Sequence, residues 1–189
     1  MSGWPPGGEA LHVEPLPVLR AGDVLPRPSL NVLGVDPGST TGLCLLGDGP
    51  HMAFSCNYAA AVPLAMWLIE VCGGPEHVHC VGEAFAPGRG AGARQQGAAV
   101  TRALITQLDG MATWRWRTAS EVKPWATDKR LAVAGLLELT SKMRDARDAA
   151  RHALFSACRD LGQPDPLSSK QAWSRADVAE SFKEWLGPS

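Results

Sequence analysis

Three strand-like segments follow one another at the start of the patterned part of the chain, and this order limits the folds that it can adopt. The segments are short and apolar, and the turns between them contain Pro, Gly and Asp, which is typical of β-strands. Segments with helical and strand periodicity then alternate. We expect strands at 31–35, 42–46, 53–57, 78–81 and 111–117. We expect helices at 60–71, between the third and fourth strands, at 94–108, between the fourth and fifth, and at 128–140 and 144–160, after the fifth. This order predicts an α/β fold with a mixed five-stranded sheet flanked by helices.

The chain divides into one core domain and two flanking segments. Its 189 residues suffice for a single core of ordinary size. Residues 1–28 hold six of the fifteen prolines, a density that removes backbone donors and predicts an extended arm. We expect the domain at 29–161 and a tail at 162–189, with a short amphipathic helix around Val178, Phe182 and Trp185.

Cysteine usage and hydropathy exclude two broad classes of protein. The five cysteines are odd in number and form no CxxC pair, which argues against a disulfide framework and against a cysteine zinc site. No apolar run approaches the ~20 residues of a membrane-spanning helix, and the Pro-rich amino end lacks the pattern of a signal peptide. We therefore expect a reduced, cytoplasmic protein without membrane contact.

The net charge of −1 conceals a strong polarity along the chain. Lys and Arg stand against Asp and Glu at 2 to 8 in residues 1–85, at 13 to 6 in 86–159 and at 3 to 5 in 160–189. The middle block therefore carries a net charge of +7, which suits a polyanionic partner. A solvated, Arg-rich helix face is the alternative explanation.

Four acidic residues occupy positions that are typical of metal-binding carboxylates. Asp36 ends the first apolar strand before a Pro-Gly turn, and Glu83 ends the fourth strand. Asp145 and Asp148 are three residues apart, so they share one face of the last helix. Mg²⁺ and Mn²⁺ prefer carboxylate oxygens, and two such ions ~4 Å apart can bind the attacking and leaving oxygens of a phosphodiester. Turn chemistry at Asp36 and a favourable first-turn position for Asp145 are the alternatives.

His152 extends the acidic face of the last helix. It lies four residues after Asp148 and seven after Asp145, which places the three side chains on one side. On this basis His152 borders the metal site or orients a water molecule. The alternative is a histidine that packs in the core or lies on the surface.

Three motifs in this order resemble those of the RuvC-type Holliday-junction resolvases, which belong to the ribonuclease H-like superfamily. Residues 31–42, NVLGVDPGSTTG, resemble the opening motif of that family, and residues 81–85, VGEAF, resemble its second acidic strand. Residues 144–154, RDARDAARHAL, resemble its final helix with the DAxDA core. The resemblance covers about residues 31–158 and implies a ribonuclease H-like fold.

The same resemblance implies a metal-dependent, dimeric endonuclease that nicks four-way DNA junctions symmetrically, in DNA recombination and repair. The four acids would hold two Mg²⁺ or Mn²⁺ ions per active site, with Asp145 at the position that varies more within the family. The helices at 60–72 and 94–108 are the candidates for a homodimer interface. The small size and the unusual arms resemble bacteriophage enzymes, which act in the cytoplasm of the bacterial host.

Basic residues between the fifth strand and the last helix resemble a further element of the family. Lys123 resembles one family lysine and Lys129 the second, although the spacing between them is shorter here. Arg130 is the alternative to Lys129. The resemblance implies that these residues lie near the scissile phosphate, where a lysine stabilises the growing negative charge. Solvated surface charge is the other explanation.

The loop and helix after the second acid supply candidate DNA-binding residues. Phe85 resembles a family aromatic that inserts among bases, although it comes one residue earlier than the family pattern expects. Stacking on a base is worth ~1–3 kcal/mol, and ordinary packing is the alternative. Arg89, Arg94 and Arg102 are candidate contacts to backbone phosphates, with helix arginines solvated in water as the alternative.

Two other patterns have structural explanations. His77, His79 and Cys80 follow one another near a strand without a fourth ligand nearby, which argues against a soft-metal site. Trp114 and Trp116 alternate along the fifth strand, as expected of side chains that pack on a sheet rather than stack on bases.

Two further functions compete with the nuclease. Residues 34–41, GVDPGSTT, also resemble the first phosphate loop of ATP-binding proteins of the actin, Hsp70 and sugar-kinase type. Those proteins need two related lobes, for which 189 residues leave no room. A non-cleaving protein that binds DNA junctions is the other alternative, and the presence of all four acids argues against it.

Overall fold

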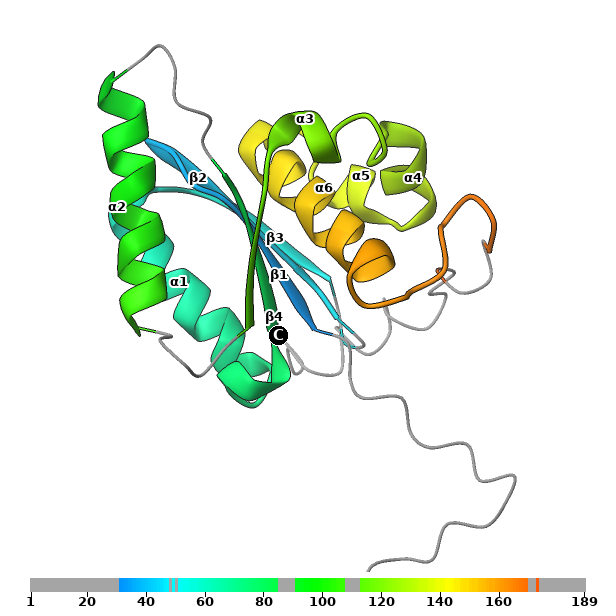
Figure 1. Cartoon of the computed structure of the whole chain (residues 1–189), viewed down its shortest axis with the longest axis horizontal. Helices are drawn as coiled ribbons and strands as arrows, with labels where there is room; N and C mark the ends of the chain where they lie inside the picture. The colour runs from blue at the N-terminus through cyan, green and yellow to red at the C-terminus, as the bar shows by residue number, and fades with distance from the viewer. Residues whose placement is uncertain are drawn as a thin grey trace, which may run out of the picture.

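The sheet has the strand order β3-β2-β1-β4-β5 in the computed structural model, which describes residues 31–47, 49, 51–84, 91–107, 113–169 and 173 and, for 91–96, only the backbone. The first three strands are antiparallel neighbours, whereas β4 and β5 run parallel to β1 (Figure 1). The strands are β1 (Val32–Asp36), β2 (Thr40–Leu46), β3 (Met52–Asn57), β4 (His79–Glu83) and β5 (Thr113–Arg117). The mixed five-stranded sheet expected from the sequence is confirmed.

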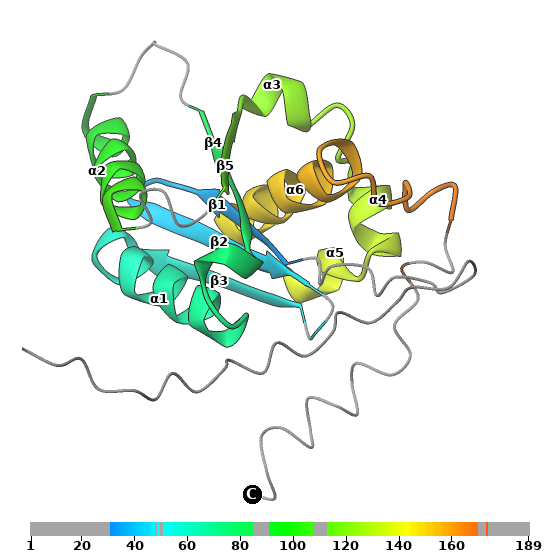
Figure 2. The same cartoon turned by 60° about the horizontal axis from the view of Figure 1, so that its bottom comes forward.

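Helices cover both faces of this sheet. Figures 1 and 2 show α1 and α2 on one face and α3 to α6 on the other. The helices are α1 (Tyr58–Val71), the short η1 (Pro75–His77), α2 (Ala91–Gln107), α3 (Ala119–Val122), α4 (Asp128–Val133), α5 (Leu136–Leu139) and α6 (Arg144–Arg159). No helix among the described residues is long and apolar enough to cross a membrane.

Capping residues set the limits of α1. The side chain of Asn57 accepts a hydrogen bond of 3.0 Å from the backbone N–H of Ala60, which satisfies one of the free donors of the first turn. Gly73 and Gly74 have φ angles of 91° and 128°, which favour glycine and stop the helix. The helix expected at 60–71 is therefore confirmed, with two more residues at its start.

The prediction of a single helix at 128–140 is wrong in one respect. It is divided into α4 and α5 at Gly135, whose φ of 73° lies in the left-handed region. The break allows Leu131 before it and Leu136 after it to be fully buried in the same cluster. The helical turn α3 was also not expected, because four residues are too few to show a period.

The helix α6 packs unusually close to the sheet. Its buried face consists mainly of small residues, namely Ala146, Ala149, Ala150, Ala153 and Ala157. Opposite them, a Cβ on Gly34 would overlap the carbonyl oxygen of Ala149, and a Cβ on Gly42 would overlap that of Asp145. Glycine in the strands and alanine in the helix thus fix the position of α6, and with it the acids of its first turns.

The two flanking segments predicted from the sequence lie mostly outside the residues that the structure describes. The arm at 1–28 and the amphipathic stretch around Val178, Phe182 and Trp185 lie outside the described residues. Trp173 is described and buried, and its indole Nε1 donates a hydrogen bond of 2.8 Å to the carbonyl oxygen of Pro164. The tail therefore begins by packing against the cluster around α6.

Candidate active site

The ends of β1 and β4 bring two of the predicted acids to neighbouring strands. Val35 pairs with Gly82 in the parallel ladder, so the next residues, Asp36 and Glu83, lie beside each other at the carboxyl edge. Side chains alternate along a strand, and the buried Val81, two residues before Glu83, belongs to the cluster under α6. Both acids therefore face α6.

The first turns of α6 carry the other two acids to the same edge. Gly42 pairs with Asp36 across the antiparallel ladder and lies directly under the backbone of Asp145. The Oγ of Ser55, on β3, donates a hydrogen bond of 3.5 Å to Oδ2 of Asp145. Asp148 follows on the same helix and is buried, with 8% of its surface exposed.

The electrostatics of Asp36 reflect this gathering of negative charge. Its pKa is raised to about 7, first by burial and then by the charges of Glu83, Asp148 and Asp145, while Lys123 lowers it. The charges of the other three predicted acids therefore reach Asp36 at one edge of the sheet, although Asp36 and Asp148 are far apart in the sequence.

The raised pKa of Asp36 makes the stability of the metal-free protein depend on pH. The folded state retains the proton of Asp36 up to a pKa of about 7, whereas the unfolded chain loses it near 3.8. Folding therefore binds a proton in this range, and the free energy of unfolding should fall by up to about 1.4 kcal/mol per pH unit from pH 4 to 7. Urea unfolding of wild type and Asp36→Asn in a chelating buffer checks this. The Asn variant should lack this fall, and an equal slope in both proteins would contradict the assignment to Asp36.

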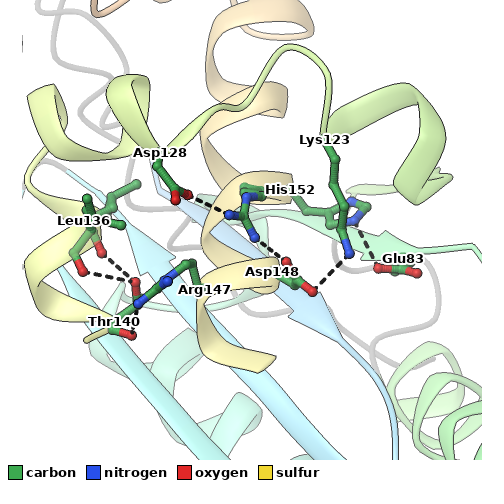
Figure 3. Close-up of polar contacts among 10 residues, drawn as sticks. Glu83, Lys123, Asp128, Leu136, Thr140, Arg147, Asp148 and His152 are labelled. Carbon is green, nitrogen blue, oxygen red and sulfur yellow. Dashed lines mark hydrogen bonds and ion pairs between the residues drawn. The ribbon is translucent and has the colours of Figure 1, made fainter. Parts of the chain in front are cut away.

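Two cations hold Asp148. The Nζ of Lys123 lies 2.9 Å from Oδ2 of Asp148 (Figure 3). Arg151 forms an ion pair with the other oxygen of Asp148. Burial alone would raise the pKa of Asp148, but hydrogen bonds and charge from Lys123 and Arg151 outweigh it, so this pKa lies below its usual value. Arg151 also pairs with Asp128 at 2.6 Å. As they stand, no three His, Cys, Asp or Glu side chains in the described part of the chain form a group that could hold a metal ion.

Arg151 is a site residue that the sequence analysis missed. Lys129 is exposed on α4, whereas Arg151 lies against the buried Asp148. The available signal was the spacing, because a residue three positions after an acid shares its helix face. Arg130, the alternative to Lys129, has other partners: it binds Asp165 through both Nε and Nη2, at 3.0 and 2.8 Å.

The candidate DNA-binding residues are only partly described. Phe85 and Arg89 lie outside the described residues, as does the side chain of Arg94. Arg102 is exposed on α2, which covers the face of the sheet opposite α6. The structure therefore does not bring Arg102 to the four acids.

His152 lies at the acidic edge and is fully buried. Its Nε2 is 3.4 Å from Oε2 of Glu83, whose side chain is 18% exposed (Figure 3). The structure thus places His152 in the core and beside Glu83, and its role at a metal site stays a prediction.

The structure also places the residues of the other two patterns. Cys80 is buried in the core, and Nδ1 of His79 lies 2.8 Å from Oγ1 of Thr113, at hydrogen-bond distance. Trp114 and Trp116 are stacked on each other with ring centroids 5.2 Å apart. A Cβ on Gly82 would overlap the ring of Trp116, which shows that this indole packs on the sheet.

Comparison with known proteins identifies the fold. No protein-family model and no curated protein matches the chain in sequence. The structure is similar to that of RuvC from T. thermophilus in complex with a Holliday junction substrate, with a TM-score of 0.54 and 16% identity, covering 70% of this chain and 96% of that one. A second T. thermophilus RuvC structure matches with a TM-score of 0.50, 16% identity and the same coverage. The chain has the ribonuclease H-like fold that its motifs predict.

Proposed function

We propose that this protein is a metal-dependent endonuclease that resolves four-way or branched DNA junctions by symmetric phosphodiester hydrolysis. The observation that carries the proposal is the meeting of acids from β1, β4 and α6 at one edge of the sheet: Asp36 and Glu83 end neighbouring parallel strands, and the backbone of Asp145 lies directly over Gly42, the partner of Asp36. The similarity of the fold to a RuvC bound to a Holliday junction supports the choice of substrate. Strand-end carboxylates at the rim of an α/β sheet are also well placed to meet a ligand.

The chemistry of the four carboxylates suits Mg²⁺ or Mn²⁺, and the side chains would have to turn toward one another to hold an ion, because as they stand no three of them in the described residues form a metal-binding group. Carboxylate oxygens are the ligands that these ions prefer, and a cation would favour the ionised form of Asp36, which burial and then the charges of the neighbouring acids disfavour. Asp36, Glu83 and Asp148 would hold the ions, with Asp145 beside them. When bound, such ions supply Lewis-acid stabilisation of the phosphate oxygens and an activated water molecule.

The basic side chains have separate roles in this proposal. Lys123, whose Nζ is 2.9 Å from Asp148, is proposed to stabilise the charge of the phosphate in the transition state. Lys129 is proposed as the second lysine of the site. Four arginines of the basic block of residues 86–159 are proposed as contacts to DNA phosphates, and Phe85, just before the block, is proposed as a base contact; the arginines are Arg89, Arg94, Arg102 and Arg130.

A two-fold substrate calls for a two-fold protein, so we include a homodimer in the proposal. Apolar side chains are exposed on the two helices expected to form its interface. These are Tyr58, Trp67 and Val71 on α1 and Ile105 on α2, with exposed fractions of 38–48%. Burial of such a patch between two copies would remove apolar surface from water.

Cleavage of a labelled four-way junction in Mg²⁺ tests the function, with a linear duplex of the same sequence as control. Paired nicks in the junction and none in the duplex support the proposal. Tight binding without cleavage would favour a non-cleaving junction binder, and ATP hydrolysis would favour the ATP-binding alternative. The mass of the protein in solution, with and without junction, tests the dimer.

Replacement of Lys123 by Ala should slow cleavage by about 100-fold, the usual effect of removing one group that stabilises transition-state charge. Affinity for Mn²⁺ should stay the same or increase, because Asp148 loses a competing cation. Single-turnover cleavage and Mn²⁺ titration measure the two effects. Lys142→Ala, at an exposed position, is the matched control. An unchanged cleavage rate, or a marked loss of Mn²⁺ affinity, would exclude this role for Lys123.

A further inference from the structure

His152 occupies a position in the core where a histidine costs stability and an apolar residue would not. The side chain is fully buried, and neither ring nitrogen has a hydrogen-bond partner within the described residues. A buried polar group without a partner costs roughly 1–3 kcal/mol of stability. An apolar side chain would fill the same space under α6 without that cost, so packing alone does not account for a histidine here.

The surroundings of His152 direct one of its nitrogens to a single acid. Its Nε2 lies 3.4 Å from Oε2 of Glu83, within ion-pair range but longer than the usual N–H···O hydrogen bond of about 2.9 Å. An ionised carboxylate only accepts hydrogen bonds, so the nitrogen that faces it carries the proton. Asp148, one helical turn earlier, is instead held by Lys123 and Arg151. Glu83 and Asp148 thus have different basic partners.

We propose that His152 is a positioning residue for Glu83: its Nε2–H would hold Oε2 and so orient the carboxylate as a ligand for a divalent cation at the acidic edge. This inference rests on the proposed function, because it assigns His152 to the metal site of that function. Groups that orient a ligating carboxylate or imidazole from behind commonly contribute 10- to 100-fold to metal affinity. The unsatisfied histidine is then the cost in stability of a preorganised ligand.

Binding of Mn²⁺ to the full chain, followed by electron paramagnetic resonance without DNA, tests the inference. His152→Leu keeps a similar volume and removes the donor, whereas His152→Gln retains an N–H. We expect the Leu variant to bind Mn²⁺ roughly 10- to 100-fold more weakly than wild type and the Gln variant to recover most of the loss. His77→Leu, at an exposed histidine, should bind as wild type.

A double-mutant cycle with Glu83→Gln separates positioning from general damage. If His152 acts through Glu83, adding His152→Leu to the Glu83→Gln protein should change its affinity for Mn²⁺ by less than about twofold. The melting temperature of metal-free His152→Leu should equal or exceed that of wild type, because a buried unsatisfied group is removed. A lower melting temperature, together with the same loss of affinity in both backgrounds, would mean a structural role and would overturn the inference.

The remaining outcomes distinguish this inference from the proposed function. Equal Mn²⁺ affinity of wild type and His152→Leu would overturn the role of His152 alone. Absence of Mn²⁺ binding to wild type would overturn it together with the proposed metal site. A cycle that behaves as expected, in a protein that cleaves no junction, would support the role of His152 and reject the proposed nuclease.

Discussion

Replacement of Asp36 by Asn should abolish junction cleavage while leaving junction binding intact. The substitution keeps the size of the side chain and removes one of the charges that would hold the cations. Cleavage in Mg²⁺ should fall by several orders of magnitude, because both stabilisation of the phosphate and activation of water depend on the bound ions. Single-turnover cleavage of a labelled junction measures the loss.

The same substitution should leave junction affinity in metal-free buffer unchanged or improve it. Affinity in this proposal comes from the basic block of residues 86–159, which carries 13 Lys and Arg against 6 Asp and Glu. Removal of a negative charge from a phosphate-facing edge cannot weaken that attraction. Asp36→Asn should also be more stable than wild type at pH 8 without metal, because burial and then the charges of neighbouring acids disfavour the ionised Asp36 carboxylate and raise its pKa.

Glu138→Gln, at an exposed acid on α5, is the charge-matched control and should bind and cleave as wild type. Cleavage by Asp36→Asn near the wild-type rate would show that the acidic edge is structural. Loss of junction affinity equal to the loss of rate would show that Asp36 supports binding or folding rather than the reaction. Either result would also remove the basis for assigning metal ligands by motif.

The strand ends were predictable because their signals are local. An apolar run that meets a Pro-Gly turn ends a strand, and alternation determines which face each residue occupies. Asp36 and Glu83 each satisfy this rule within a few residues, and the helical spacing of Asp145 and Asp148 is equally local. The sequence therefore suggests the four acids as one group, and the fold explains how they meet.

The basic partners were not predictable, because long-range packing selects them. Arg130 appears from the sequence to be an alternative to Lys129, yet it binds Asp165, which is 35 residues away, and stacks over Trp125. Arg151 takes Asp128, 23 residues away, as its second partner. No periodicity connects such pairs. The break at Gly135 has a similar origin, since a helical pattern continues through it and only the burial of Leu131 and Leu136 on both sides favours the break.

The glycine at position 42 links the stability of the fold to the site. A Cβ there would overlap the carbonyl group of Asp145 and the amide nitrogen of Ala146, and neither backbone group can turn aside as a side chain would. Gly42→Ala should therefore force α6 away from β2, at a cost of about 3 kcal/mol, the upper range for overpacked cores. Since Asp145 and Asp148 move with the helix, cleavage should fall as well.

Thermal unfolding and Mn²⁺ affinity of Gly42→Ala check this expectation together. The melting temperature should fall by roughly 10 °C, given about 2–4 °C per kcal/mol for a domain of this size. Gly49→Ala is the control, because an added Cβ there has no atom within 4 Å, and it should change stability by less than about 1 kcal/mol. A Gly42→Ala protein that melts as wild type but binds Mn²⁺ weakly would show that α6 moves at little cost. Unchanged melting and unchanged Mn²⁺ affinity together would mean that the close approach of α6 to the sheet does not position the acids.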